Sequence, residues 1–72
     1  MTAKDQSKML NAGFTIIKKK DYPRPNKNSR IEIRQKTPVN RNWHTRDWNF
    51  TSVDERDFRM KQLLKDPKIV ED

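Results

Sequence analysis

The sequence contains no cysteine, which excludes a disulfide framework, a thiolate nucleophile and a cysteine-based zinc site. His44 is the single histidine and has no second ligand at helical or strand spacing, so a metal site is not expected. No apolar run approaches the roughly 18 residues that cross a membrane, and the N-terminus lacks the apolar core of a signal peptide. We therefore expect a cytoplasmic protein with no metal and no membrane contact.

Glycine is almost absent: Gly13 is the only one, so the chain has no glycine-rich loop for a phosphate group. The acidic residues lie mainly near the C-terminus, among basic residues that compensate their charge. No nucleophile, base and orienting residue can be assembled from these positions. We expect no enzymatic activity, no cofactor and no small-molecule substrate.

The chain is short, with 72 residues of which 31% are hydrophobic and 38% charged. Such a chain forms one domain with a small core, and partial disorder or oligomerisation is compatible with this composition. Residues 1–12 are polar and carry no long periodic pattern, which predicts a flexible arm or, alternatively, a short N-terminal turn. Residues 13–72 are expected to form the domain.

What the chain has in excess is positive charge, and that charge is unevenly distributed. The segment from Gly13 to Asn49 contains ten Lys or Arg and three acids, whereas residues 50–72 contain five basic and six acidic residues. The formal net charge of +7 therefore resides in the middle of the chain. A basic region of this kind favours a polyanionic partner, nucleic acid first.

Three segments of the basic region have the composition and alternation of β-strands. They are residues 14–19, 30–36 and a third that begins near Trp43, separated by segments rich in proline and asparagine. The second alternates cleanly, with Ile31 and Ile33 on one face and charged residues on the other. The pattern predicts a sheet with one buried face and one wet, mostly positive face.

A helix is predicted to follow the third strand. Ser52 and Glu55 have the spacing of a capping box, and Glu55 with Arg59 forms a favourable i,i+4 pair. Pro67 ends the helix soon after Lys65. The predicted fold is α+β, a three-stranded antiparallel sheet packed on one C-terminal helix, in the order βββα.

The positive face supplies the candidate nucleic-acid contacts. A row of cations on exposed strands can neutralise phosphates and release counterions, although exposed strands also carry Lys and Arg merely for solubility. Trp43 either stacks on a base or, more commonly in small domains, belongs to the core. The candidates are Arg30, Arg34, Lys36, Arg41, Arg46, Lys18, Lys20 and Trp43.

A second hypothesis concerns Phe58, which falls away from the apolar stripe of the predicted helix. With Ile69 and Val70 it would form an interface for a homodimer or a protein partner. Alternatively, Phe58 packs under the N-terminal arm against Met9 and Leu10. Under this hypothesis the chain is a protein-interaction module whose basic face is only solvated.

The middle and C-terminal segments also resemble a known family. Arg30-Ile31-Glu32-Ile33-Arg34, the stretch from Trp43 to Trp48, and Phe50-x-Ser52-x-x-Glu55 are similar to the arm-site DNA-binding domain of tyrosine recombinases of phages and conjugative transposons. The resemblance covers roughly residues 30–65 and implies a three-stranded sheet that enters the DNA major groove. The family's turn glycines and recombinase domain are missing here. We thus expect a small, non-catalytic accessory protein that binds DNA, with RNA as another possible partner.

Overall fold

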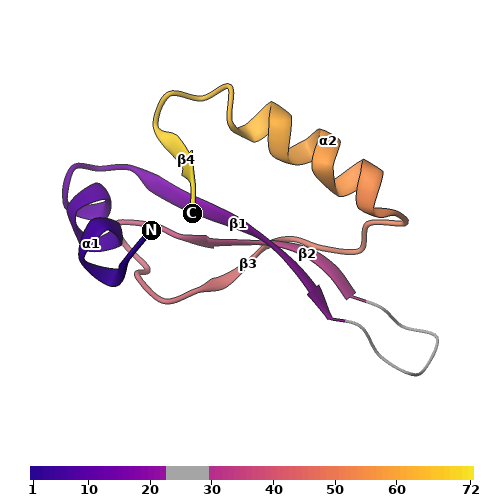
Figure 1. Cartoon of the computed structure of the whole chain (residues 1–72), viewed down its shortest axis with the longest axis horizontal. Coiled ribbons are helices and arrows are strands. Elements are labelled where there is room, and N and C mark those ends of the chain that lie inside the picture. Colours follow the sequence, from indigo (N-terminus) through magenta and orange to yellow (C-terminus); the bar gives the residue numbers. More distant parts are fainter. Residues whose placement is uncertain (23–29) are drawn as a thin grey trace.

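The computed structural model describes the backbone of residues 1–22 and 30–72, and within these ranges every side chain except those of residues 21, 22 and 30. Helices and strands follow one another in the order α1, β1, β2, β3, α2, β4 (Figure 1). Their bounds are α1 Ala3–Asn11, β1 Thr15–Tyr22, β2 Arg30–Lys36, β3 His44–Asp47, α2 Val53–Leu63 and β4 Ile69–Glu71.

The strands form one mixed sheet in the order β3-β2-β1-β4. The pairs β1–β2 and β2–β3 are antiparallel, whereas β4 runs parallel to β1. The prediction of an α+β fold with three antiparallel strands and a C-terminal helix is therefore confirmed in outline. The predicted number of elements is wrong: β4 adds a fourth strand to the sheet, and α1 is a second helix.

Strand β4 exists because the chain turns sharply after α2. The amides of Lys68 and Ile69 donate to the side chain and carbonyl of Asp66 at 2.9 and 3.0 Å. The turn lays residues 69–71 along the start of β1, where the Thr15 amide donates to the Lys68 carbonyl at 2.8 Å. This pairing joins segments far apart in the sequence, so no local pattern announces it.

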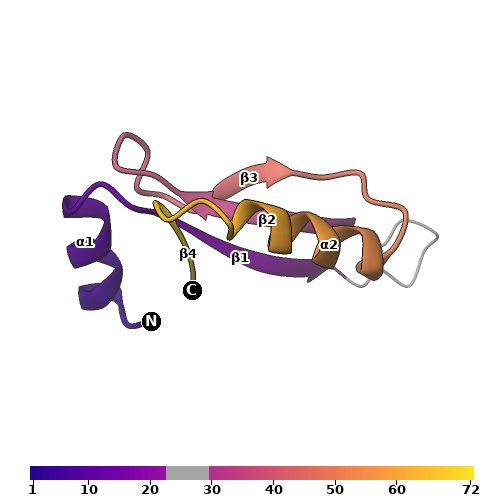
Figure 2. The ribbon, with the colours of Figure 1, turned by 90° about the horizontal axis from the view of Figure 1, so that it is seen from above.

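Helix α2 lies over one face of the sheet (Figure 2). It begins where the capping pattern predicts, because the Ser52 hydroxyl accepts a hydrogen bond from the Glu55 amide at 3.1 Å. The main core lies beneath it and consists of four buried side chains: Ile17, Ile33, Met60 and Leu63. We call this side of the sheet the α2 face.

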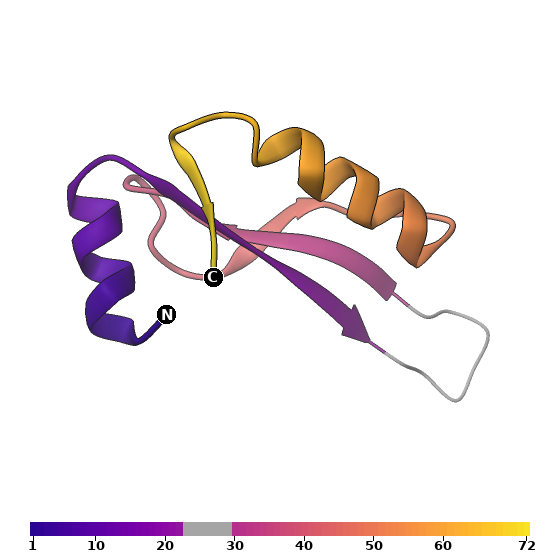
Figure 3. The same ribbon diagram turned by 45° about the horizontal axis from the view of Figure 1, so that its top comes forward.

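Helix α1 occupies residues that the sequence predicts to be a flexible arm. Its first turn is capped by Thr2, whose hydroxyl accepts from the Asp5 amide at 3.1 Å, and Leu10 near its end is buried. Gly13 then turns the chain into β1 with a φ of 91°, a left-handed conformation that favours glycine. Helix α1 thus packs at one end of the sheet, away from α2 (Figure 3).

Candidate nucleic-acid interface

The sheet face opposite α2 gathers basic side chains from two neighbouring strands. Because strand side chains alternate, Ile17 and Ile33 point toward α2 while their neighbours point away from it. The register pairs Lys18 with Arg34 and sets Lys36 beside Ile16. We call the side chains of Lys18, Lys20, Arg34, Lys36 and Trp43 the basic face.

Trp43 lies at the centre of the basic face. The Nζ atoms of Lys18 and Lys36 lie 4.1 and 5.0 Å from the centroid of its ring, close enough for cation–π attraction. The Arg34 Nη2 donates to the Trp43 carbonyl at 3.0 Å. Trp43 is half-buried and does not belong to the core cluster; its ring contacts two ammonium groups, and its backbone carbonyl holds the Arg34 guanidinium.

One end of the basic face is bordered by a carboxylate. Lys36 Nζ donates to Gln6 Oε1 at 2.8 Å, and Gln6 Nε2 donates to Asp72 Oδ1 at 3.0 Å. Burial raises the pKa of Asp72, but the Gln6 hydrogen bond, the N-terminal ammonium and Lys18 together hold that pKa below its usual value. Asp72 is therefore ionised at neutral pH and limits the positive potential at this end.

A second acid lies within the basic face itself. Glu32 is only 1% exposed, and its Oε2 lies 3.9 Å from the Arg34 Nη1. Its alternation with Ile33 was evident from the sequence, but its burial was not. Glu32 offsets part of the charge of Arg34, which leaves the lysines as the groups best placed to contact an anion.

Arg46 and Arg41 lie apart from the basic face. Arg46 Nη1 donates to Gln35 Oε1 at 2.7 Å, and Gln35 alternates with Arg34, which places Arg46 on the α2 face. The register irregularity between Ile33 and Arg34 accompanies this placement. Arg41 donates to the side chain of Asn11 at 2.7 Å, at the end of the sheet beside α1.

Arg30 opens β2, but its side chain lies outside the described residues. The structure therefore assembles Lys18, Lys20, Arg34, Lys36 and Trp43 from the predicted set and separates Arg41 and Arg46 from them.

Sequence reasoning missed the polar contacts that join β3 to β2, to the preceding loop and to α2. His44 Nδ1 donates to the Asn42 carbonyl at 2.9 Å, and its Nε2 lies 3.0 Å from the Gln35 amide nitrogen, which donates to it. Arg59 of α2 donates to Asp47 Oδ2 at 3.2 Å. These bonds fasten the edge strand β3. In the part of the chain that the structure describes, no three His, Cys, Asp or Glu residues are grouped to hold a metal ion.

The residues of the predicted interface do not form one patch. Phe58 is 64% exposed, so it does not pack against Met9 or Leu10 as the alternative proposed. Ile69 packs against the core cluster, and Val70 is half-buried in β4. Phe58 therefore stands alone as the exposed aromatic of α2.

Comparisons with known proteins add no relative: no family model, no curated protein and no solved structure matches this chain. Neither helix in the described ranges is long and apolar enough to cross a lipid bilayer.

Proposed function

We propose that this chain is a small, non-catalytic accessory protein that binds nucleic acid, DNA first, through its basic face. The observation that carries the proposal is the gathering of Lys18, Arg34 and Lys36 around Trp43 on the side of the sheet opposite α2. Cations held in this way can neutralise several phosphates and release their counterions on binding.

The shape of the sheet favours duplex DNA over a featureless polyanion. A small sheet or β-ribbon fits the major groove, where Lys18 and Lys36 can contact phosphates and Trp43 offers a surface for contact with a base or sugar. The resemblance to arm-site domains of tyrosine recombinases implies the same docking mode. Helix α1 narrows the free part of the face, so we expect contact to centre on β1 and β2.

The proposal is tested by paired variants with the same net charge. The double variant Lys18→Gln/Lys36→Gln removes two cations from the basic face, whereas Lys61→Gln/Lys65→Gln removes two exposed cations from α2 and its end. Binding to a labelled DNA duplex and to a single-stranded RNA is measured by fluorescence anisotropy at about 50 and 200 mM salt.

We expect the first double variant to bind duplex DNA at least about tenfold more weakly at low salt, with a salt slope reduced by about two. The control double variant should remain within about twofold of the wild type. Equal losses in both would mean that only net charge matters, and no binding by the wild type at 50 mM salt would overturn the proposal. If the protein binds RNA more strongly than DNA, the basic face remains the proposed binding surface and RNA replaces DNA as the proposed ligand.

A further inference from the structure

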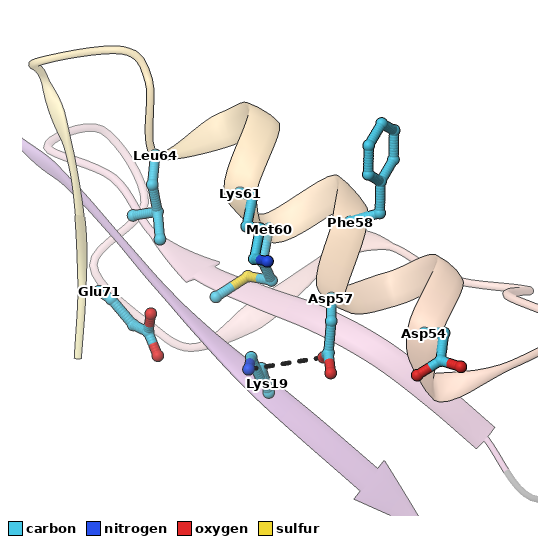
Figure 4. A pocket seen from close by; sticks show the side chains of 8 residues that line it. All are labelled: Lys19, Asp54, Asp57, Phe58, Met60, Lys61, Leu64 and Glu71. Carbon is cyan, nitrogen blue, oxygen red and sulfur yellow. Dashed lines mark ion pairs between the residues drawn. The ribbon is translucent and has the colours of Figure 1, made fainter.

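A groove lies between α2 and β1, on the opposite side of the sheet from the basic face (Figure 4). It has a volume of about 510 Å³, with Met60 and Leu64 as its apolar part and Phe58 at its outer rim. The Lys19 ammonium lies 3.5 Å from Asp57 Oδ1 and bridges the two walls. The remaining lining residues are Asp54, Lys61 and Glu71.

Strand β1 lies at the base of this groove, and within residues 1–22 and 30–72 its edge beyond β4 carries no strand. Strand β4 pairs only with Thr15, Ile16 and Ile17, and the Asp72 amide makes the last bond, to the Ile17 carbonyl at 2.9 Å. Among the described residues no strand pairs with that edge of β1 beyond this point. Figure 4 shows β4 ending beside Glu71, short of Lys19.

The register identifies which backbone groups face outward. Because the Thr15 amide and the Ile17 carbonyl bond toward β4, the amide and carbonyl of Lys19 point to the same side by alternation. In the antiparallel ladder with β2, Lys19 and Ile33 are accordingly a pair that exchanges no hydrogen bond. Lys19 therefore presents one donor and one acceptor to an incoming strand.

We propose that β1 accepts an extended peptide of a partner protein as an additional strand, in line with β4, and that this peptide alternates apolar and acidic residues. Its apolar side chains would enter the groove beside Met60 and Leu64. Its acidic side chains would point to the opposite side of the sheet. There they would meet Lys18 and Lys20, the neighbours of Lys19 in sequence, whose side chains belong to the basic face. Main-chain hydrogen bonds then supply affinity and the alternation supplies specificity.

Charge argues against a second copy of this chain as the occupant. Antiparallel pairing of β1 with β1 would place the lysines of residues 18–20 opposite one another, and like charges directly opposite destabilise a sheet. Lysine on an edge strand is a common means of preventing such self-pairing. An acidic segment removes this repulsion. The main-chain hydrogen bonds and the groove are distinct from the basic face, whereas Lys18 and Lys20 belong to both surfaces, so a bound peptide and a bound nucleic acid would compete for these two lysines.

The test uses a labelled, end-blocked peptide that alternates leucine or valine with glutamate, titrated against the whole protein. Lys19→Pro removes the outward amide and leaves the β1–β2 hydrogen bonds intact, since that amide does not point toward β2. Lys19→Ala is the matched control, because it removes the side chain and the Asp57 ion pair but keeps the amide. Circular dichroism establishes that each variant is folded.

We expect Lys19→Pro to weaken peptide binding at least tenfold and Lys19→Ala to remain within threefold of the wild type. Peptides N-methylated at alternate residues test the same point on the unmodified protein: methylation in one frame should abolish binding, and methylation in the other should not. Equal binding of the two methylated peptides would overturn the proposal, as would a dimer that Lys19→Pro dissociates and that the peptide does not compete with.

Discussion

The two faces of the sheet are built from alternating residues of the same strands, yet they differ in what they bury. On the α2 face, Ile17 and Ile33 are fully buried under α2. On the basic face, the neighbouring Lys18 and Arg34 are half-buried around Trp43. A one-residue alternation therefore separates the core under α2 from the residues that we propose to bind nucleic acid, although Ile16 and Glu32 are also buried on the side of the basic face.

The largest expected effect contrasts two neighbouring residues of β1. Ile17→Ala should lower the free energy of unfolding by about 2–5 kcal/mol, because it leaves a cavity in the core. Lys18→Ala should change it by about 1 kcal/mol or less, since it removes a cation–π contact with Trp43 and a charge attraction to Asp72 but leaves no cavity in the core. Urea unfolding measures both. If Ile17→Ala does not fold, Ile17→Val, with an expected cost of about 0.5–1.5 kcal/mol, replaces it. Equal costs at residues 17 and 18 would erase the contrast between the faces.

The second prediction tests which cations belong to the basic face. Lys36→Gln should weaken DNA binding about 3- to 10-fold and reduce the salt slope by about one, as expected for one phosphate contact. Arg46→Gln removes the same charge from the α2 face and should leave affinity within about twofold. Anisotropy titrations compare them. A larger loss for Arg46→Gln would mean that the ligand contacts the opposite side of the sheet.

The third prediction concerns the N-terminal cap of α2, the helix that covers the α2 face. Ser52→Ala should cost about 1 kcal/mol of unfolding free energy, because the Glu55 amide loses its capping acceptor. Ser7→Ala is the matched control: Ser7 is exposed within α1, where alanine is the better helix former. It should leave stability unchanged within about 0.5 kcal/mol in the same unfolding experiment. A similar cost at Ser7 would show that the cap has no special role.

The smallest expected effect is a pH dependence at the same cap. Glu55 accepts hydrogen bonds from the hydroxyl and the amide of Thr51, which lower the pKa of its carboxyl group below 4.5. A lowered pKa in the folded state means that this contribution to stability is present at neutral pH and is lost as the pH falls through the lowered value.

Glu55→Gln should therefore be less stable than the wild type at pH 7 and equal to it near pH 2. Thermal unfolding across this range measures the difference. Thr51→Val keeps the amide donor but removes the hydroxyl, so it should show part of the same loss. A stability difference that does not change with pH would contradict the assigned role of the Glu55 carboxylate.

The elements that sequence patterns predicted are those with local causes. Strand β2 was predicted with its observed bounds because residues 30–36 alternate regularly, and α2 begins at its Ser52 cap. Helix α1 was missed because Leu10 is its only fully buried residue, which gives too weak a periodicity. Strand β4 was missed as an element because three residues pair with a strand some 50 positions earlier.

For the candidate site too, the sequence predicted the features that depend on local alternation and missed those that depend on contacts between distant segments. Alternation placed Arg34 and Lys36 on a common face and set Trp43 on the side opposite His44 and Arg46. It could not reveal that the ammonium groups of two lysines lie against the Trp43 ring, because those contacts join three segments of the chain. Nor does alternation predict the burial of Glu32, which depends on the surrounding side chains rather than on its own strand.

The most direct test of the central claim is NMR titration of the isotopically labelled protein with a DNA duplex at low salt. The account predicts that the indole N–H signal of Trp43 and the amide signals of Lys18, Arg34 and Lys36 shift progressively, while those of Phe58 and Lys61 on α2 do not. Shifts centred on α2 and its groove, or no shifts at all, would contradict the assignment of nucleic-acid binding to the basic face.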